Sequence, residues 1–224
     1  MGLIAKHCSD RVAAVRSVDL GSIWSLLCKM LSGTTDHDNV SSLAIFRCIV
    51  SIAGSLIRLR RDIVTHTLPH LAFVLHRLLL ITRRMRLQLG AKQSKLVAGT
   101  LPSWISPSQP LGVAESRALS PVLTHSLSQL TAHRDCRRNT KAESPAKPFA
   151  KHAGHVLLAY IDSMNDSLWV LTPEIRRELE PGQFSLCEML GEYNRYALTA
   201  PALDSNSKTL MKSLWREYEY VGKG

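Results

Sequence analysis

The stretch 171–224 constrains the fold of this chain more than any other, because its turns and helix ends fall on residues that favour them. Thr172 can serve as an N-cap, and Pro173 follows at a first helical position, where its missing N–H costs nothing. Pro181 and Gly182 then predict the end of this short helix and the start of another. The stretch therefore predicts a succession of helices.

The closing helix of the chain is predicted from apolar residues spaced three and four positions apart. Asp204 can cap its start, and its apolar stripe comprises Leu210, Met211, Leu214, Trp215 and Tyr218. Trp215 and Tyr218 lie on this stripe, so we assign both side chains to the core. Tyr196 and Tyr220 fall off the apolar stripes, which makes them candidates for a surface that contacts a partner.

Similar stripes recur along the chain and predict helices at 19–31, 43–57, 67–89, 116–130, 149–164, 173–179, 183–198 and 205–221. In the 67–89 helix, Met85 and Leu89 are expected to face inward, and Gly90 is expected to act as the C-cap. No run of alternating apolar and polar residues is long enough to predict a strand. The stripes follow no fixed sequence period. We therefore predict an all-α fold, an irregular α-solenoid-like stack of amphipathic helices.

Changes in composition divide the chain into segments. Residues 1–95 predict an N-terminal helical segment with a basic face, and residues 96–112 predict a Pro- and Ser-rich ordered loop or linker around Trp104. Residues 113–224 predict a C-terminal helical domain. Within it, the polar and basic tract 133–148 is predicted to be a disordered surface loop.

The chain carries a formal net charge of +10 at pH 7, and much of this charge is concentrated in one region. Between positions 57 and 95 there are nine Arg and Lys residues against one acidic residue, Asp62. The candidate contact residues are Arg58, Arg60, Arg61, Arg83, Arg84, Arg86, Lys92 and Lys95. Because arginine pairs well with phosphate, these residues predict contact with RNA or with a partner protein. An alternative explanation for part of this grouping of arginines is the preference of cations for helix C-termini, which involves no partner.

The sequence contains no catalytic motif of the GxSxG, P-loop, Rossmann or HExxH type. Asp62, His66 and His70 are four positions apart, and His152 and His155 three apart, as ligands on one helix face would be. No further ligand of suitable spacing accompanies either set. We therefore predict no enzymatic activity, no cofactor, no metal site and no small-molecule substrate.

The cysteines and the apolar segments indicate in which cellular compartment the protein is expected. Five cysteines are spread far apart without a Cys-x-x-Cys pair, which predicts reduced thiols in a cytosolic or nuclear protein. The first residues lack the apolar core of a secretion signal. The most apolar window, 68–81, is short for a bilayer span and contains His70, His76 and Arg77, so we predict no membrane span.

Three strings of sequence carry a resemblance to a known family: HAGHVLLAYI from His152, LTPEIRRELEPG from Leu171 and LDSNSKTLMKSLWREYEYVGKG from Leu203. Their order and spacing resemble the C-terminal domain of the nucleolar pre-rRNA-processing family also called unhealthy ribosome biogenesis protein 2. The resemblance covers residues 149–224 and continues more diffusely over 114–132. It implies that further parts of such a domain lie outside this sequence.

The resemblance implies a non-enzymatic ribosome biogenesis factor of the nucleolus. Such a factor would act as a scaffold in early pre-60S particles and support processing of the large-subunit rRNA precursor. Its implied partners are pre-60S assembly factors and the rRNA precursor, contacted directly or indirectly, with no membrane. The alternative left open by the sequence is an α-helical protein-interaction adaptor with no RNA role.

Overall fold

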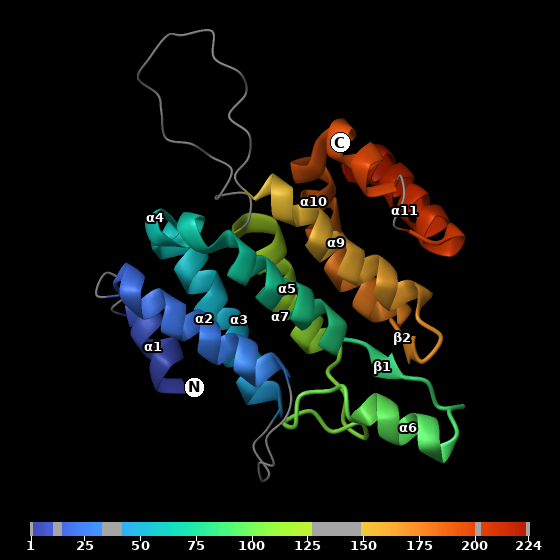
Figure 1. The fold of residues 1–224 in the computed structure, drawn as a ribbon, viewed down its shortest axis with the longest axis horizontal. Coiled ribbons are helices and arrows are strands. Elements are labelled where there is room, and N and C mark those ends of the chain that lie inside the picture. The colour runs from blue at the N-terminus through green and yellow to red at the C-terminus, as the bar shows by residue number, and fades with distance from the viewer. Residues whose placement is uncertain (1, 11–14, 33–41, 127–148, 200–202, 223–224) are drawn as a thin grey trace, which may run out of the picture.

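The chain folds into helices joined by short connections, with one very small sheet (Figure 1). The computed structural model describes residues 2–10, 15–32, 42–126, 149–199 and 203–222. In this part of the chain the predicted all-α class is confirmed. The solenoid-like stacking stays a prediction.

The α-helices are α1 (Gly2–Asp10), α2 (Ser17–Ser32), α3 (Ser42–Leu59), α4 (Arg61–Val64), α5 (Leu68–Ile81), α6 (Ala91–Ala98), α7 (Val113–Pro121), α9 (Ala150–Asn165), α10 (Pro173–Thr199) and α11 (Ser205–Glu217). Shorter elements are the 3-10 turn η2 (Thr65–Thr67), the π turns η3 (Val122–Ser126) and η4 (Tyr218–Gly222), and the strands β1 (Arg84–Met85) and β2 (Trp169–Val170). The helices predicted at 19–31, 43–57, 149–164 and 205–221 are confirmed to within a few residues at each end, the last one closing in the π turn η4. Helix α1 was not predicted from the sequence.

The helices pack in two rows, and each row runs from one side of the molecule to the other (Figure 1). In one row α2 contacts α5, α5 contacts α9, and α9 contacts α11. In the other row α1 contacts α3, α3 contacts α7, and α7 contacts α10. Contacts between α9 and α10 join the rows, so residues from both ends of the sequence share one hydrophobic cluster. The division of the chain at residues 95 and 113 stays a prediction about domains.

Large side chains at the centre of the cluster also hold the connections in place. Trp24, Phe46 and Phe149 are fully buried. The indole N–H of Trp24 donates to the hydroxyl of Thr67 at 2.9 Å, which fixes the short turn before α5. The indole N–H of Trp104 donates to a backbone carbonyl of α2 at 2.7 Å, and its ring is buried. Of the two predicted alternatives, the segment after α6 is therefore an ordered loop around Trp104.

Helix α5 lies between α2 and α9, and eight of its 14 residues are buried (Figure 1). The segment Arg61–Ile81, which ends in α5, is long and apolar enough to cross a membrane by length and composition alone. In the fold, Leu71, Leu75 and Leu78 of this segment are fully buried against other helices. A central core helix accounts for the same apolar composition.

The helix predicted at 67–89 is wrong in its second half. Helix α5 ends at Ile81, and the chain then forms β1, which pairs antiparallel with β2 in the register Arg84↔Val170 and Met85↔Trp169. The apolar spacing that predicted the helix continues past Ile81, but Met85 is half-buried in the β1–β2 pair instead. Gly90 is the N-cap residue of α6 and has no role as a C-cap. The prediction that the chain lacks strands is corrected by the same pair.

The break predicted at Pro181 and Gly182 is also wrong, because α10 runs through both residues as one helix. Helix α10 packs against α7 and η3 along this stretch. A Cβ atom added to Gly182 would lie 2.6 Å from the Cβ of Leu123, which is fully buried. Gly182 is therefore a contact residue: its missing side chain allows α10 to approach η3.

Other predictions fall on the edge of the described residues. The helix predicted at 116–130 begins earlier, at Val113, and is described as far as Ser126. The predicted disordered loop 133–148 lies outside the described residues, and so does the side chain of Tyr196. Tyr220, the other predicted surface tyrosine, is exposed, whereas Trp215 and Tyr218 are buried as predicted.

Candidate functional site

The eight predicted contact residues form two groups at opposite ends of α5. Arg58, Arg60 and Arg61 lie where α3 meets α4, whereas the second group lies in β1 and its flanks and on α6, with members Arg83, Arg84, Arg86, Lys92 and Lys95. Helix α5 has 14 residues and is therefore roughly 21 Å long. The structure does not bring the two groups together, so each is a separate candidate.

In the first group, the guanidinium of Arg60 already has hydrogen-bond partners within the chain. Its guanidinium donates to both carboxylate oxygens of Asp62 at 3.1 Å and also to the backbone carbonyl of Val15. The hydrogen bond with Arg60 lowers the pKa of Asp62. Arg60 therefore ties the segment before α2 to the start of α4, while Arg58 is exposed at the end of α3.

In the second group, Arg83 is a structural residue. Its guanidinium pairs with the carboxylate of Asp166 at 3.0 Å and lies over the ring of Trp169, 4.8 Å from the ring centroid. Its Nε also donates to the carbonyl of Leu80 at 2.8 Å. Burial lowers the pKa of Arg83, and Asp166 acts in the opposite direction. These contacts hold the end of α5 against the turn between α9 and β2.

The neighbouring arginines are less enclosed. Arg86 is exposed, and its Nε donates to the carbonyl of Trp169 at 3.1 Å. Hydrogen bonds to carbonyls leave its positive charge uncompensated. Arg84 is half-buried, and its Nε is buried without a hydrogen-bond partner among the described residues. Both arginines can therefore still interact with an anionic partner.

Lys92 and Lys95 are exposed on α6, a few residues beyond Arg86. We call Arg84, Arg86, Lys92 and Lys95 the basic corner (lower right in Figure 1). The sequence identified its members, but it did not reveal the contacts of Asp166 and Trp169 that position the corner. Those two residues are at least 80 positions away from Arg83 and Arg86, and no local pattern links them.

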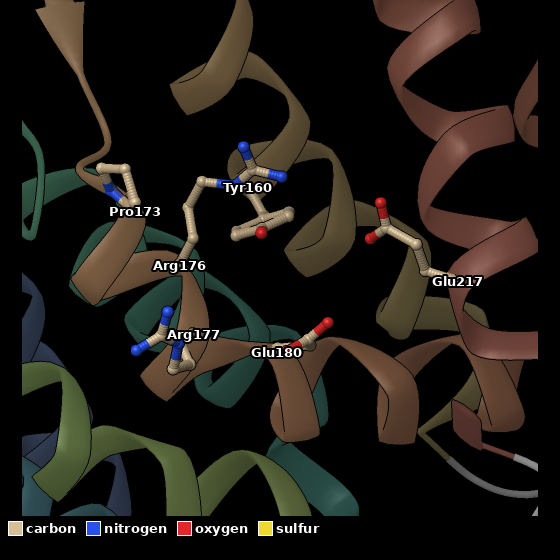
Figure 2. A pocket seen from close by; sticks show the side chains of 6 residues that line it. All are labelled: Tyr160, Pro173, Arg176, Arg177, Glu180 and Glu217. Atoms are coloured by element: carbon tan, nitrogen blue, oxygen red, sulfur yellow. The ribbon is translucent and has the colours of Figure 1, made fainter. Parts of the chain in front are cut away.

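A separate cavity of about 210 Å³ lies between α9, α10 and α11 (Figure 2). Its lining combines two arginines with two glutamates, a buried tyrosine and a proline: Arg176, Arg177, Glu180, Glu217, Tyr160 and Pro173. Burial raises the pKa of Tyr160, while a hydrogen bond from Arg176 acts to lower it. The charges in this cavity balance, so it does not extend the basic corner.

The histidines considered as metal ligands lie in η2, α5 and α9. The 3-10 turn η2 separates Asp62 from His70, and His66 and His70 are exposed. His155 stacks on His76 of α5, with ring centroids 4.3 Å apart and ring planes 3° apart. In the described part of the chain, no three His, Cys, Asp or Glu side chains gather in a way that could hold a metal ion.

The stacked His76 predicts a dependence of stability on pH. Burial, followed by the charges of His155, Arg77 and Arg83, lowers the pKa of His76 from 6.5 to about 4. As the pH falls below about 6.5, the unfolded chain takes up a proton on this ring that the folded chain excludes. The free energy of unfolding should therefore decrease between about pH 6.5 and about pH 4. Urea unfolding at about pH 7 and about pH 5 measures the decrease.

Two variants separate His76 from the other groups that titrate in this range. His76→Phe keeps a ring in the stack but cannot take up a proton, so its unfolding midpoint should fall less with pH than that of the wild type. His66→Phe changes an exposed histidine in η2 and should keep the wild-type decrease. An equal decrease in the wild type and His76→Phe would contradict the prediction.

Comparisons with known proteins give one match. The family model described as the Urb2/Npa2 family matches residues 1–223. The match covers the N-terminal helices as well as the C-terminal strings that carried the resemblance, and it confirms that resemblance. Nothing matches the chain among curated proteins or among solved structures.

Proposed function

Because this chain belongs to the Urb2/Npa2 family, which acts in ribosome biogenesis, we propose that it is a non-enzymatic scaffold in early pre-60S particles. In this role it supports processing of the large-subunit rRNA precursor in the nucleolus. Its helices hold pre-60S assembly factors, and Lys92 and Lys95 of its basic corner lie against the rRNA precursor. The observation that carries the proposal is the family match over residues 1–223.

The exposed lysines of the basic corner support contact with RNA. Lys92 and Lys95 are on the same short helix and have no acidic neighbour within α6. Contacts of this kind bind the phosphate backbone without reading the base sequence. They would hold a scaffold against folded RNA without sequence recognition.

The test reverses the charge of exposed residues, where a substitution should not destabilise the fold. Replacing Arg83 by Glu would place a carboxylate against Asp166 and destabilise the chain, so Arg83 is unsuitable. The double variant Lys92→Glu, Lys95→Glu changes two exposed residues instead. We expect it to weaken binding to a transcribed rRNA precursor. The slope of log affinity against log salt should decrease by about 1 for each lysine that contacts phosphate.

The matched control is Lys29→Glu, Lys212→Glu, which changes the net charge equally at exposed positions of α2 and α11. It should bind like the wild type if the basic corner is the site. Sedimentation of the tagged protein with pre-60S particles provides the cellular measurement. Equal RNA binding by both double variants would contradict a role for the basic corner. Recovery of proteins alone, insensitive to salt, would favour the adaptor alternative.

A further inference from the structure

A groove of about 580 Å³ runs beside β1. One wall consists of residues 84–88, and the rest comes from the 107–110 turn and from Val170 and Thr172. All five consecutive residues of 84–88 line the groove, whereas a groove across one face of a strand would touch alternate residues. Arg84, Arg86, Val170 and Thr172 project from one face of the β1–β2 pair, so the groove covers that face, reaches the edge of β1 at Met85 and continues into the turn that follows.

The backbone of β1 is open along this edge. In the described part of the chain the sheet has two strands, β1 and β2, so β1 pairs on one side. Arg86 donates its N–H to the carbonyl of Leu168 at 3.1 Å, and Arg84 is opposite Val170. Since backbone groups alternate in direction along an antiparallel strand, the N–H and C=O of Met85 point away from β2. An added strand could pair with them.

The side chains of the groove combine apolar and cationic character. Met85, Val170 and two prolines supply apolar surface, and Leu87 is fully exposed beside them. Arg84 and Arg86 supply positive charge, and the lining contains no carboxylate. Methionine and arginine are enriched at protein–protein interfaces, and the groove presents both beside the exposed Leu87.

Two glutamates, Glu115 and Glu174, lie near Arg84 but do not line the groove. Hydrogen bonds from its own backbone N–H and with Thr172 lower the pKa of Glu174, and the charge of Arg84 adds to this shift. The carboxylate of Glu115 accepts the N–H of Gly112 at 2.6 Å, which occupies one of its oxygens at the start of α7. Glu174 is exposed in the first turn of α10 and is not part of the lining. The Nε of Arg84 remains buried without a hydrogen-bond partner among the described residues. The groove is therefore complementary to a negatively charged occupant.

We propose that this groove binds an extended acidic segment of a partner protein, which adds to the edge of β1 as a third strand. Main-chain hydrogen bonds to Met85 would give affinity, and acidic side chains near Arg84 and Arg86 would give specificity. Alternating apolar side chains would cover Leu87. The lining contains no aromatic side chain on which a base could stack, which favours a peptide over single-stranded RNA.

The inference deepens the proposed scaffold function and rests on it for its biological meaning. The two can fail separately, because the groove is tested by peptide binding and the lysines of the basic corner, which do not line the groove, by RNA binding. A variant at Leu87 leaves Lys92 and Lys95 in place. Loss of peptide binding with normal RNA binding would concern the groove alone.

The probe is a short fluorescent peptide in which Glu alternates with Val, and the readout is fluorescence anisotropy with the full chain. We expect this peptide to bind, and Leu87→Glu to weaken its affinity about tenfold or more. Leu87 is fully exposed, so the variant should fold like the wild type. The matched control is Leu96→Glu, which adds the same charge at a residue that is 75% exposed on α6 and outside the groove. It should leave the affinity unchanged.

Two further probes identify the kind of occupant. A peptide in which Lys alternates with Val should not bind, and methylation of the backbone nitrogens of the Glu–Val peptide should abolish its binding. Equal binding of the Glu and Lys peptides, or equal effects of the two variants, would overturn the proposal. Binding of polyuridylate in place of the Glu–Val peptide, lost in Leu87→Glu, would overturn it in favour of RNA.

Discussion

Trp215→Ala is expected to lower the free energy of unfolding by about 3–5 kcal/mol. The indole of Trp215 is 3% exposed and packs edge-on against Tyr218, with ring centroids 5.9 Å apart. The guanidinium of Arg195 lies over the same ring, 4.9 Å from its centroid. Truncation therefore removes apolar contacts and a cation–π contact together, and α11 loses its main anchor. Chemical denaturation followed by circular dichroism measures the loss.

The control for this prediction is Tyr220→Ala, five positions further along the chain. Tyr220 is 91% exposed, so its truncation should change the free energy of unfolding by no more than about 0.5 kcal/mol. A small effect of Trp215→Ala, comparable with that of Tyr220→Ala, would show that Trp215 does not stabilise the fold. The loss of unfolding free energy in Trp215→Phe should lie between the losses in these two variants, since phenylalanine keeps an aromatic ring in part of the space that the indole fills.

Gly182→Ala is expected to destabilise the chain by about 3 kcal/mol, although alanine is the better helix former. The added Cβ would lie 2.6 Å from the Cβ and 2.9 Å from the Cδ1 of Leu123. Leu123 is fully buried, so it cannot move aside into solvent. Because the closest atom is the Cβ of Leu123, which no change of rotamer can move, α10 and η3 have to move apart. A urea unfolding curve reports the loss as a lower midpoint.

Gly21→Ala is the matched control, because Gly21 is an exposed glycine inside helix α2. No atom lies within 4 Å of the position that its Cβ would take. This substitution should stabilise the chain by about 0.5–1 kcal/mol through helix propensity alone. The two alanines should therefore have opposite effects. A stabilising Gly182→Ala would mean that α10 and η3 are not packed as closely as described.

The helices that the sequence predicted well are those whose boundaries are set locally. Helix α11 begins where the side chain of Asp204 accepts the N–H of Ser207 at 3.1 Å, and its apolar stripe points into the core. Helices α2, α3 and α9 likewise carry uninterrupted stripes. Local capping and local periodicity are both visible in a sequence, and here they agree with the tertiary packing.

The errors arose where a distant contact outweighed a local signal. Pro181 and Gly182 have the composition of a helix break, but close packing of Gly182 against Leu123 keeps α10 continuous. Past Ile81 the apolar spacing favours a longer helix, yet Arg84 and Met85 pair with a strand that lies more than 80 positions later. Neither partner can be identified from the residues around the break.

The same distinction applies to the candidate site. Arg60 pairs with Asp62, two positions away, which the sequence could have suggested. Arg83 pairs with Asp166, which lies 83 positions away, and the sequence could not have suggested that pair. Composition therefore identified the basic residues but could not separate those that hold the fold together from those that are exposed, such as Lys92 and Lys95.

The packing of α5 against α9 has a consequence for the nascent chain. During synthesis, α5 is complete at Ile81 and can pack on α2, but α9, which covers its other apolar face, begins at Ala150. At translation rates of roughly 5–20 residues per second, that face stays uncovered for several seconds. For this interval a stretch with the length and composition of a membrane span is exposed to the cytosol. Newly made chains should therefore depend on chaperones that shield apolar helices until α9 emerges.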